Sequence, residues 1–264
     1  MKTNDSRMNV CAVFAWIAGT VVAAPAFAGL VPQSALYTFG GTASAEGMFT
    51  SEIDSDSFSG GQTQPSPTPF AQFEDGNLVT TSWQDSSFPT LTATGNAHAV
   101  INGLAPTSTQ WSVVGVADAT VTGDYFNGAL GKGHAWSGAT FVFSVDTLSA
   151  YRLMGAVTGR GASLVDQTWV NFDETAFVEL WQGTTLLHRA EGLNPGSPVD
   201  FDFAGMLAPG EYRVEARATA RTESLAFGQP WSPNVGFDAV LTVPGVPGLV
   251  FAVCAAPITL RRRR

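Results

Sequence analysis

Three acidic residues alternate with uncharged ones in the stretch Glu52-Ile53-Asp54-Ser55-Asp56. On a β-strand, such alternate side chains point to one face. Two carboxylates held about 5–5.5 Å apart can act as nucleophile and general acid in the cleavage of a glycosidic bond. Ser- and Gly-rich sequence follows immediately, so we favour a solvated acidic loop and predict no catalytic residue.

The same stretch resembles in part the E-x-D-x-E strand of some β-jelly-roll glycoside hydrolases, with Asp56 at the last position. It also weakly resembles a calcium loop, which places oxygen ligands at alternate positions. Asp54 and Asp56 would be two of the ligands, whereas Phe58 occupies a third ligand position. We therefore keep calcium as a candidate cofactor, with Asp54 and Asp56 as weak candidate ligands, and predict no other metal.

Aromatic residues are the second group that could bind a ligand. The chain has 7 Trp and 18 Phe, more than a small β-domain needs for its core. An exposed indole presents an apolar ring face on which the C–H groups of a sugar can stack. Trp136, in a Gly/Ser context, and Trp231, between two prolines, are the candidates for such stacking. Core packing is the alternative for each of them.

Other catalytic and metal-binding patterns are missing from the sequence. His98, His134 and His188 are far apart and lack the spacing of a metal site, so we expect them on strands or on the surface. The chain has no G-x-S-x-G motif, which argues against the nucleophile elbow of a serine hydrolase.

Short β-rich runs occur throughout the middle of the chain. Turn residues separate these runs, as at Gln182-Gly183 and Pro209-Gly210, which predict hairpin or strand-to-strand turns. We read residues 53–69 as a long exposed loop, because they are rich in Ser, Gly and Pro. About a dozen short strands predict one all-β domain over residues 29–242, an antiparallel β-sandwich or jelly roll. The runs are 35–40, 77–83, 91–101, 110–123, 139–145, 151–157, 167–172, 176–181, 184–190, 199–203, 207–218 and 235–243.

The first residues have the pattern of a secretory signal peptide. Basic residues precede an apolar run over 10–24, and the small-residue site Ala26-x-Ala28 follows. We predict that 1–28 is a signal helix that is removed, so that the mature chain begins at Gly29. A buried N-terminal helix is the alternative.

The last 22 residues combine prolines, an apolar segment over 248–260 and a terminal arginine cluster. The apolar segment is shorter than the roughly 17–25 residues of a membrane span. Arginines that stay cytoplasmic would nevertheless halt an exported chain at this point. The segment could therefore act as a retained membrane anchor.

This tail resembles the PEP-CTERM sorting signal of bacterial surface proteins. The resemblance implies export, processing by an exosortase-type sorting protease, and attachment to the cell envelope or an extracellular polysaccharide matrix. It implies no activity and covers residues 243–264 alone. The matching residues are Val243, Pro244, Gly245, Val246, Pro247, Arg261, Arg262, Arg263 and Arg264.

The domain and the two ends of the chain differ in net charge. The full chain has a net charge of −9, but 6 of its 13 basic residues and 1 of its 22 acidic residues lie in the ends. Residues 29–242 therefore retain 7 basic and 21 acidic residues, a net charge of −14. Such a domain is unsuited to nucleic acid. Both cysteines also lie in the ends, which excludes thiol catalysis and a cysteine-bound zinc from the domain.

We therefore expect a non-enzymatic protein of the bacterial cell surface or extracellular matrix, exported and sorted through its tail. The expected partners are a sorting protease, extracellular polysaccharide and, through the tail, the membrane. The alternative is a secreted glycan-active enzyme on a jelly-roll fold.

Overall fold

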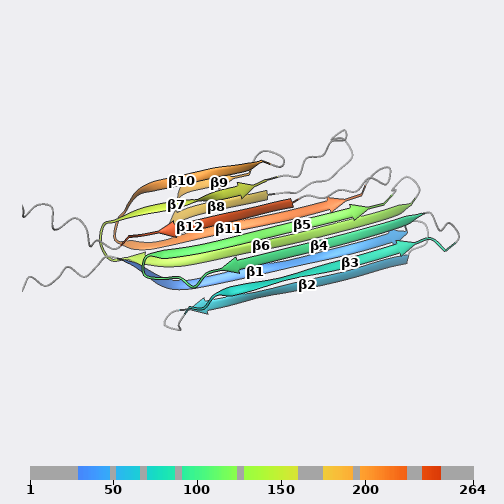
Figure 1. Cartoon of the computed structure of the whole chain (residues 1–264), viewed down its shortest axis with the longest axis horizontal. Coiled ribbons are helices and arrows are strands. Elements are labelled where there is room, and N and C mark those ends of the chain that lie inside the picture. The colour runs from blue at the N-terminus through green and yellow to red at the C-terminus, as the bar shows by residue number, and fades with distance from the viewer. Residues whose placement is uncertain are drawn as a thin grey trace, which may run out of the picture.

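The computed structural model describes residues 29–47, 52–65, 70–86, 91–123, 128–159, 175–192, 197–224 and 234–244. These residues form two six-stranded antiparallel sheets that pack face to face, with their strands along the long axis of the molecule (Figure 1). The predicted antiparallel β-sandwich is confirmed. Within the described ranges, no helix has the length and apolar character needed to cross a bilayer.

The first sheet, sheet A, has the strand order β2-β1-β6-β11-β8-β9, and sheet B has the order β10-β7-β12-β5-β4-β3. The strands of sheet A are β1 (Leu30–Gly47), β2 (Glu52–Pro65), β6 (Ala129–Val145), β8 (Thr175–Gln182), β9 (Thr185–Glu191) and β11 (Gly210–Glu223). The strands of sheet B are β3 (Phe73–Gln84), β4 (Thr92–Gly103), β5 (Gln110–Thr122), β7 (Ser149–Thr158), β10 (Pro198–Leu207) and β12 (Asn234–Thr242).

One end of the sandwich has an aromatic core. Phe141 and Phe143 lie on the same face of β6, as their spacing predicts, and both are fully buried. Phe141 stacks on Trp111 with ring centroids 5.0 Å apart, and Phe143 stacks on Tyr212 at 5.6 Å. The Trp111 indole N–H donates to the Tyr37 hydroxyl at 3.3 Å, so the polar atoms of both rings are satisfied inside the core.

At the other end of the sandwich, glycines of β4 and β6 meet the backbone of the facing sheet, and the side chains beside them form a small separate cluster around Trp83. A Cβ on Gly131 of β6 would lie 2.1 Å from the Thr94 carbonyl oxygen of β4. A Cβ on Gly95 of β4 would lie 2.3 Å from the Lys132 carbonyl oxygen of β6. Sheets of ordinary sandwiches are about 10 Å apart because side chains fill the space between them. Here the backbones of the two sheets are in direct contact. Along β6 the inward-facing residues therefore change from phenylalanine at one end to glycine at the other.

The predicted loop over residues 53–69 is wrong for most of its length. Residues Glu52–Pro65 form strand β2, and 66–69 lie outside the described residues. β2 is an edge strand whose backbone pairs with β1 alone, and most of its side chains are exposed. Its backbone ladder therefore tolerates Ser- and Gly-rich sequence. The Phe58 side chain of β2 packs against the core, with its ring centroid 6.1 Å from that of Phe39.

The strands are also longer than the short ones expected. β1 has 18 residues and β6 has 17, whereas about 5–6 is usual. Gly and small polar residues in these runs continue the alternation of buried and exposed positions. The two predicted turns are confirmed, because β8 ends at Gln182 before β9 begins, and β11 begins at Gly210.

Candidate ligand-binding face

The outer face of sheet A is the side of this sheet that points away from sheet B. On β6 the alternation of buried small residues with larger ones places Lys132, His134, Trp136 and Gly138 on this face. β6 is a central strand of sheet A, flanked by β1 and β11 (Figure 1). The outward side chains of β6 therefore lie in the middle of this face. None of the described strands packs against this surface.

Trp136 lies on this face and does not belong to the buried core. Its partner across the β1–β6 ladder is Gly40. A Cβ on Gly40 would lie 2.1 Å from Cζ2 of Trp136, so the indole lies against the backbone of β1. The His134 ring is beside it, with centroids 5.2 Å apart and planes at 39°. The indole is thus held in place while remaining partly exposed, which is the arrangement that ligand stacking requires.

Two hollows lie along β6, one on each side of Trp136. The first has a volume of about 340 Å³, and Trp136 itself lines it together with hydroxyl, aliphatic and charged side chains. The second has a volume of about 590 Å³ and lies beyond His134. The first is lined by Leu36, Thr38, Thr140, Glu215 and Arg217, and the second by Thr42, Ser44, Ser57, Lys132, Arg221 and Glu223, among others. The second hollow is therefore predominantly polar, whereas the first combines polar and apolar lining in about equal parts.

Strand β11 supplies a row of charges that was not anticipated as part of a site. Its inward residues include Tyr212, Val214 and Ala216, which form the apolar face that the sequence predicts. The residues between them point to the outer face. These outward residues are Glu211, Arg213, Glu215, Arg217, Thr219, Arg221 and Glu223. The sequence contains a signal for this row, because charged residues occur at nearly every second position of β11, which is the side-chain period of a strand.

Lys132 forms an ion pair with acidic side chains on both neighbouring strands. Its Nζ donates to Glu46 Oε1 of β1 at 2.8 Å, and Glu223 Oε1 of β11 is 3.7 Å away. Partial burial lowers the pKa of the Lys132 ammonium, but the hydrogen bonds and charges of the two carboxylates outweigh that effect and raise the pKa. The positive charge of Lys132 is therefore neutralised locally.

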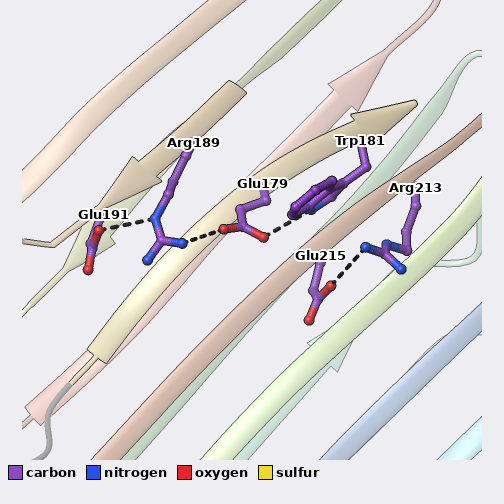
Figure 2. Close-up of polar contacts among 6 residues, drawn as sticks. All are labelled: Glu179, Trp181, Arg189, Glu191, Arg213 and Glu215. Carbon is purple, nitrogen blue, oxygen red and sulfur yellow. Dashed lines mark hydrogen bonds and ion pairs between the residues drawn. The ribbon is translucent and has the colours of Figure 1, made fainter. Parts of the chain in front are cut away.

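A second charged network lies on the same face over β8, β9 and β11 (Figure 2). Glu179, only 5% exposed, accepts from Arg189 Nη1 at 2.6 Å and from the Trp181 indole N–H at 2.9 Å. Arg189 also donates to Glu191 at 3.1 Å, and this hydrogen bond is the largest of the effects that raise its pKa.

Trp181 differs from Trp136 in what covers its ring. The Arg213 guanidinium lies over the Trp181 ring, 5.3 Å from the centroid, and its Nη2 is 3.6 Å from Glu215 Oε2. The indole N–H of Trp181 is already bonded to Glu179. Trp181 is therefore part of the network that holds the sheet, and Trp136 is the better platform for a ligand.

Arg217 and Arg221 are exposed, and neither forms an ion pair with a carboxylate in the described ranges. Arg217 Nε donates to the Thr219 hydroxyl at 3.3 Å. In the ladder between β11 and β6, Thr219 is the partner of Trp136. The two guanidiniums thus start from positions diagonal to Trp136, on either side of it along β11.

Two carboxylates of the acidic stretch of β2 accept hydrogen bonds from the neighbouring sheet. Glu52 Oε2 accepts from the Trp83 indole N–H at 3.1 Å, and Asp54 Oδ2 accepts from the Ser82 backbone N–H at 3.1 Å. Both donors are on β3, the edge strand of sheet B, so the carboxylates connect the two sheets along one edge. Asp56 Oδ1 accepts from the Ser57 N–H next to it. No described group of three or more His, Cys, Asp or Glu side chains could hold a metal ion.

Most residues of the predicted terminal signals lie outside the described residues. These are Ala26, Ala28, Gly245, Val246, Pro247, Arg261, Arg262, Arg263 and Arg264, and the stacking candidate Trp231 also lies outside. Gly29 is described just before β1. Val243 is fully buried, and its N–H donates to the Thr109 carbonyl at 2.9 Å, so the packed domain extends through this residue. Pro244 follows it and is exposed.

Comparison with known proteins gives no match: no family model matches the chain, and no curated protein is significantly similar to it.

Proposed function

We propose that this chain is a non-enzymatic, exported surface or matrix protein that binds polysaccharide through the outer face of sheet A. Trp136 carries the proposal. Its partly exposed indole lies against Gly40 between two hollows, one of mixed character and one predominantly polar. A flat, open platform with hydroxyl side chains around it suits a sugar chain lying along the sheet, because rings stack on the indole and hydroxyls find polar partners.

Such a site binds each sugar weakly. An aromatic contact adds about 0.5–1.5 kcal/mol beyond the area it buries, which by itself gives low affinity. Tight retention in a matrix then comes from many copies of the protein and many repeats of the polymer acting together. Weak, multivalent attachment is consistent with a scaffolding role and does not require turnover of the ligand.

The binding test uses affinity electrophoresis of the full-length protein through gels that contain a panel of soluble polysaccharides. We expect one or more polymers to retard the protein and Trp136→Ala to lose most of this retardation. Gly40→Ala should have the same effect, because its Cβ displaces the indole. Leu78→Ala is the matched control, since Leu78 is an exposed apolar residue on sheet B. Unchanged retardation of Trp136→Ala would contradict the proposed site.

The non-enzymatic part of the proposal has its own test. Incubation of the wild-type protein with the polysaccharides that it binds should release no new reducing ends. If reducing ends appear and Glu52→Gln abolishes them, the glycan-active enzyme is the correct interpretation, and the β2 carboxylates act in catalysis.

Export and sorting are supported by the patterns at the two ends of the sequence. Mass spectrometry of the protein isolated from the cells that make it should find an N-terminus at Gly29 and a C-terminus that lacks Arg261 to Arg264. A mature protein that retains Arg264 would contradict processing by a sorting protease and would favour a retained membrane anchor.

A further inference from the structure

We infer that the ligand of this face is an acidic polysaccharide whose sugars carry carboxylates, that is, a uronate-type polymer. The inference rests on the proposed function and adds the chemical class of the ligand. It depends on where the domain places its few basic residues.

Most of the basic residues of the domain lie on one surface; Arg160 is outside the described residues. Residues 29–242 have 7 basic residues against 21 acidic ones. Those on the outer face of sheet A are Lys132, Arg189, Arg213, Arg217 and Arg221. Arg152 lies on β7 of sheet B, where its Nε and Nη2 donate to Asp202 at 2.8 and 2.6 Å. An acidic domain that concentrates its cations in this way has a local surface suited to an anion.

Most of these cations are neutralised by carboxylates of the protein. Lys132 is paired with Glu46 and Glu223, as described above. Arg189 is paired with Glu179 and Glu191, and Arg213 with Glu215. These pairs leave little charge for a ligand, and the face as a whole is not basic, because the glutamates on it are at least as numerous as the cations.

Arg217 and Arg221 are the exception, and they are the ones beside Trp136. Their partners across the ladder on β6 are Gly138 and His134, which flank Trp136 in sequence. A sugar stacked on the indole would therefore have one guanidinium within reach in each direction along the sheet. A guanidinium binds a carboxylate through two parallel hydrogen bonds, so each arginine provides a specific acceptor for one acidic sugar.

The spacing of the two arginines favours a polymer over a single acidic sugar. They are four residues apart on one strand, which corresponds to about 13 Å at 3.3 Å per residue. This spacing between the Cα atoms is longer than one sugar residue, so a polymer can use both arginines without their side chains converging. A chain of sugars that crosses Trp136 can contact both arginines. The sugars before and after the stacked one then lie over the two hollows.

Charge density argues for a uronate polymer over nucleic acid. Glu215 and Glu223 lie on the same strand as the two arginines, and the domain carries −14 overall. A ligand with closely spaced phosphates would be repelled by these carboxylates. A polymer with about one charge per sugar can place its carboxylates at the arginines and neutral hydroxyls elsewhere.

The test compares two forms of one polymer that differ in charge. The full-length protein is titrated with polygalacturonate and with the same polymer fully methyl-esterified, and alginate serves as a second acidic polymer. We expect binding to the acidic forms to be at least about ten-fold tighter at low salt. This preference should shrink as the salt rises from about 10 mM to about 1 M, where the Debye length falls from about 30 to about 3 Å.

Variants assign the preference to the two arginines. The double variant Arg217→Gln/Arg221→Gln should lose the preference and bind both forms of polygalacturonate equally. Arg152→Gln, which removes a cation from the other sheet, should keep it. Retention of the preference in the double variant would overturn the inference.

The remaining outcomes separate the inference from the proposed function. Equal binding of the acidic and esterified polymers by the wild type overturns the acidic-ligand inference and supports a neutral polysaccharide site at Trp136. Binding of none of these polymers, or of any in the panel above, overturns both. Duplex DNA is included as a competitor, and DNA that competes as well as polygalacturonate would overturn the assignment to polysaccharide.

Discussion

Replacing Gly131 with alanine tests whether the thin end of the sandwich is held by contact between backbones. The new Cβ would lie 2.1 Å from the Thr94 carbonyl oxygen and 2.5 Å from that of Thr122. Real Cβ atoms almost never come within 3.0 Å of another heavy atom, so the sheets must separate by about 0.9 Å at this point. Both oxygens belong to paired strands, so neither can move aside as a flexible side chain would.

The size of the effect follows from that displacement. A gap of 0.5–1 Å removes about a quarter to a half of each dispersion contact across it. Overpacking of a core costs about 1–3 kcal/mol, and the rigid neighbours place Gly131→Ala near the upper value. For a domain of this size, about 3 kcal/mol lowers Tm by roughly 6–12 °C.

The matched control is Gly138→Ala on the same strand. Gly138 is on the outer face, and its Cβ would meet the nearest atoms at 3.4 Å, an ordinary contact. Loss of backbone entropy in the unfolded chain should leave its Tm unchanged or raise it slightly. Thermal unfolding followed by far-UV circular dichroism measures both variants. A Tm for Gly131→Ala within about 2 °C of that for Gly138→Ala would refute the backbone-contact interpretation.

A double-mutant cycle sharpens this test. Gly95→Ala disturbs the same contact between the two sheets from the β4 side, because its Cβ would meet the backbone oxygens of Lys132 and Ser44. Once one alanine has separated the sheets, the second costs less, so the double variant should lose less stability than the sum of the single variants. Full additivity would indicate that the two glycines act at independent sites.

Three further predictions concern charges and ionisable groups. Glu179→Gln should lower the free energy of unfolding in urea by about 1–3 kcal/mol, less than for a fully buried pair because Arg189 is 41% exposed; no measurable change would show that the network is dispensable. Asp202→Asn should leave Tm unchanged, because both members of its ion pair are more than half exposed, and a clear drop would contradict this. Burial raises the pKa of Tyr37 above its ordinary value of 10.0, so the stability contributed by its neutral phenol is complete below about pH 10 and is lost as the pH rises through the folded-state pKa. The free energy of unfolding should therefore fall more steeply above pH 10 in the wild type than in Tyr37→Phe, and parallel pH profiles would contradict the assignment.

The all-β class and the inward faces of several strands could be read from the sequence, because alternation at period two is a local property of the chain. The stretch that includes Phe141 and Phe143 and the stretch that includes Tyr212 and Val214 are examples, and both are buried as expected. The strand β2 could not be read in this way, since an edge strand needs a backbone partner more than it needs apolar side chains.

The candidate site was only partly accessible from the sequence. Trp136 stood out by residue type and context, but residue type alone does not distinguish a buried tryptophan from an exposed one. The roles of Arg217 and Arg221 depend on which carboxylates lie near the other cations, and those carboxylates come from β1, β8, β9 and β11. Pairing between strands distant in the chain has no local signal.

By itself, the sequence determined the strand content, the acidic charge of the domain and the signal-like pattern at each end, because these depend on composition and short-range order. The tertiary structure decided that Gly40 leaves room for the Trp136 ring and that glycines bring the sheets into contact. It also decided that Arg217 and Arg221 beside this ring form no ion pair with a carboxylate of the described residues. The physical reason is that these properties arise from ladder register and sheet packing, which juxtapose residues of different strands, such as Gly40 with Trp136 and Gly131 with Thr94.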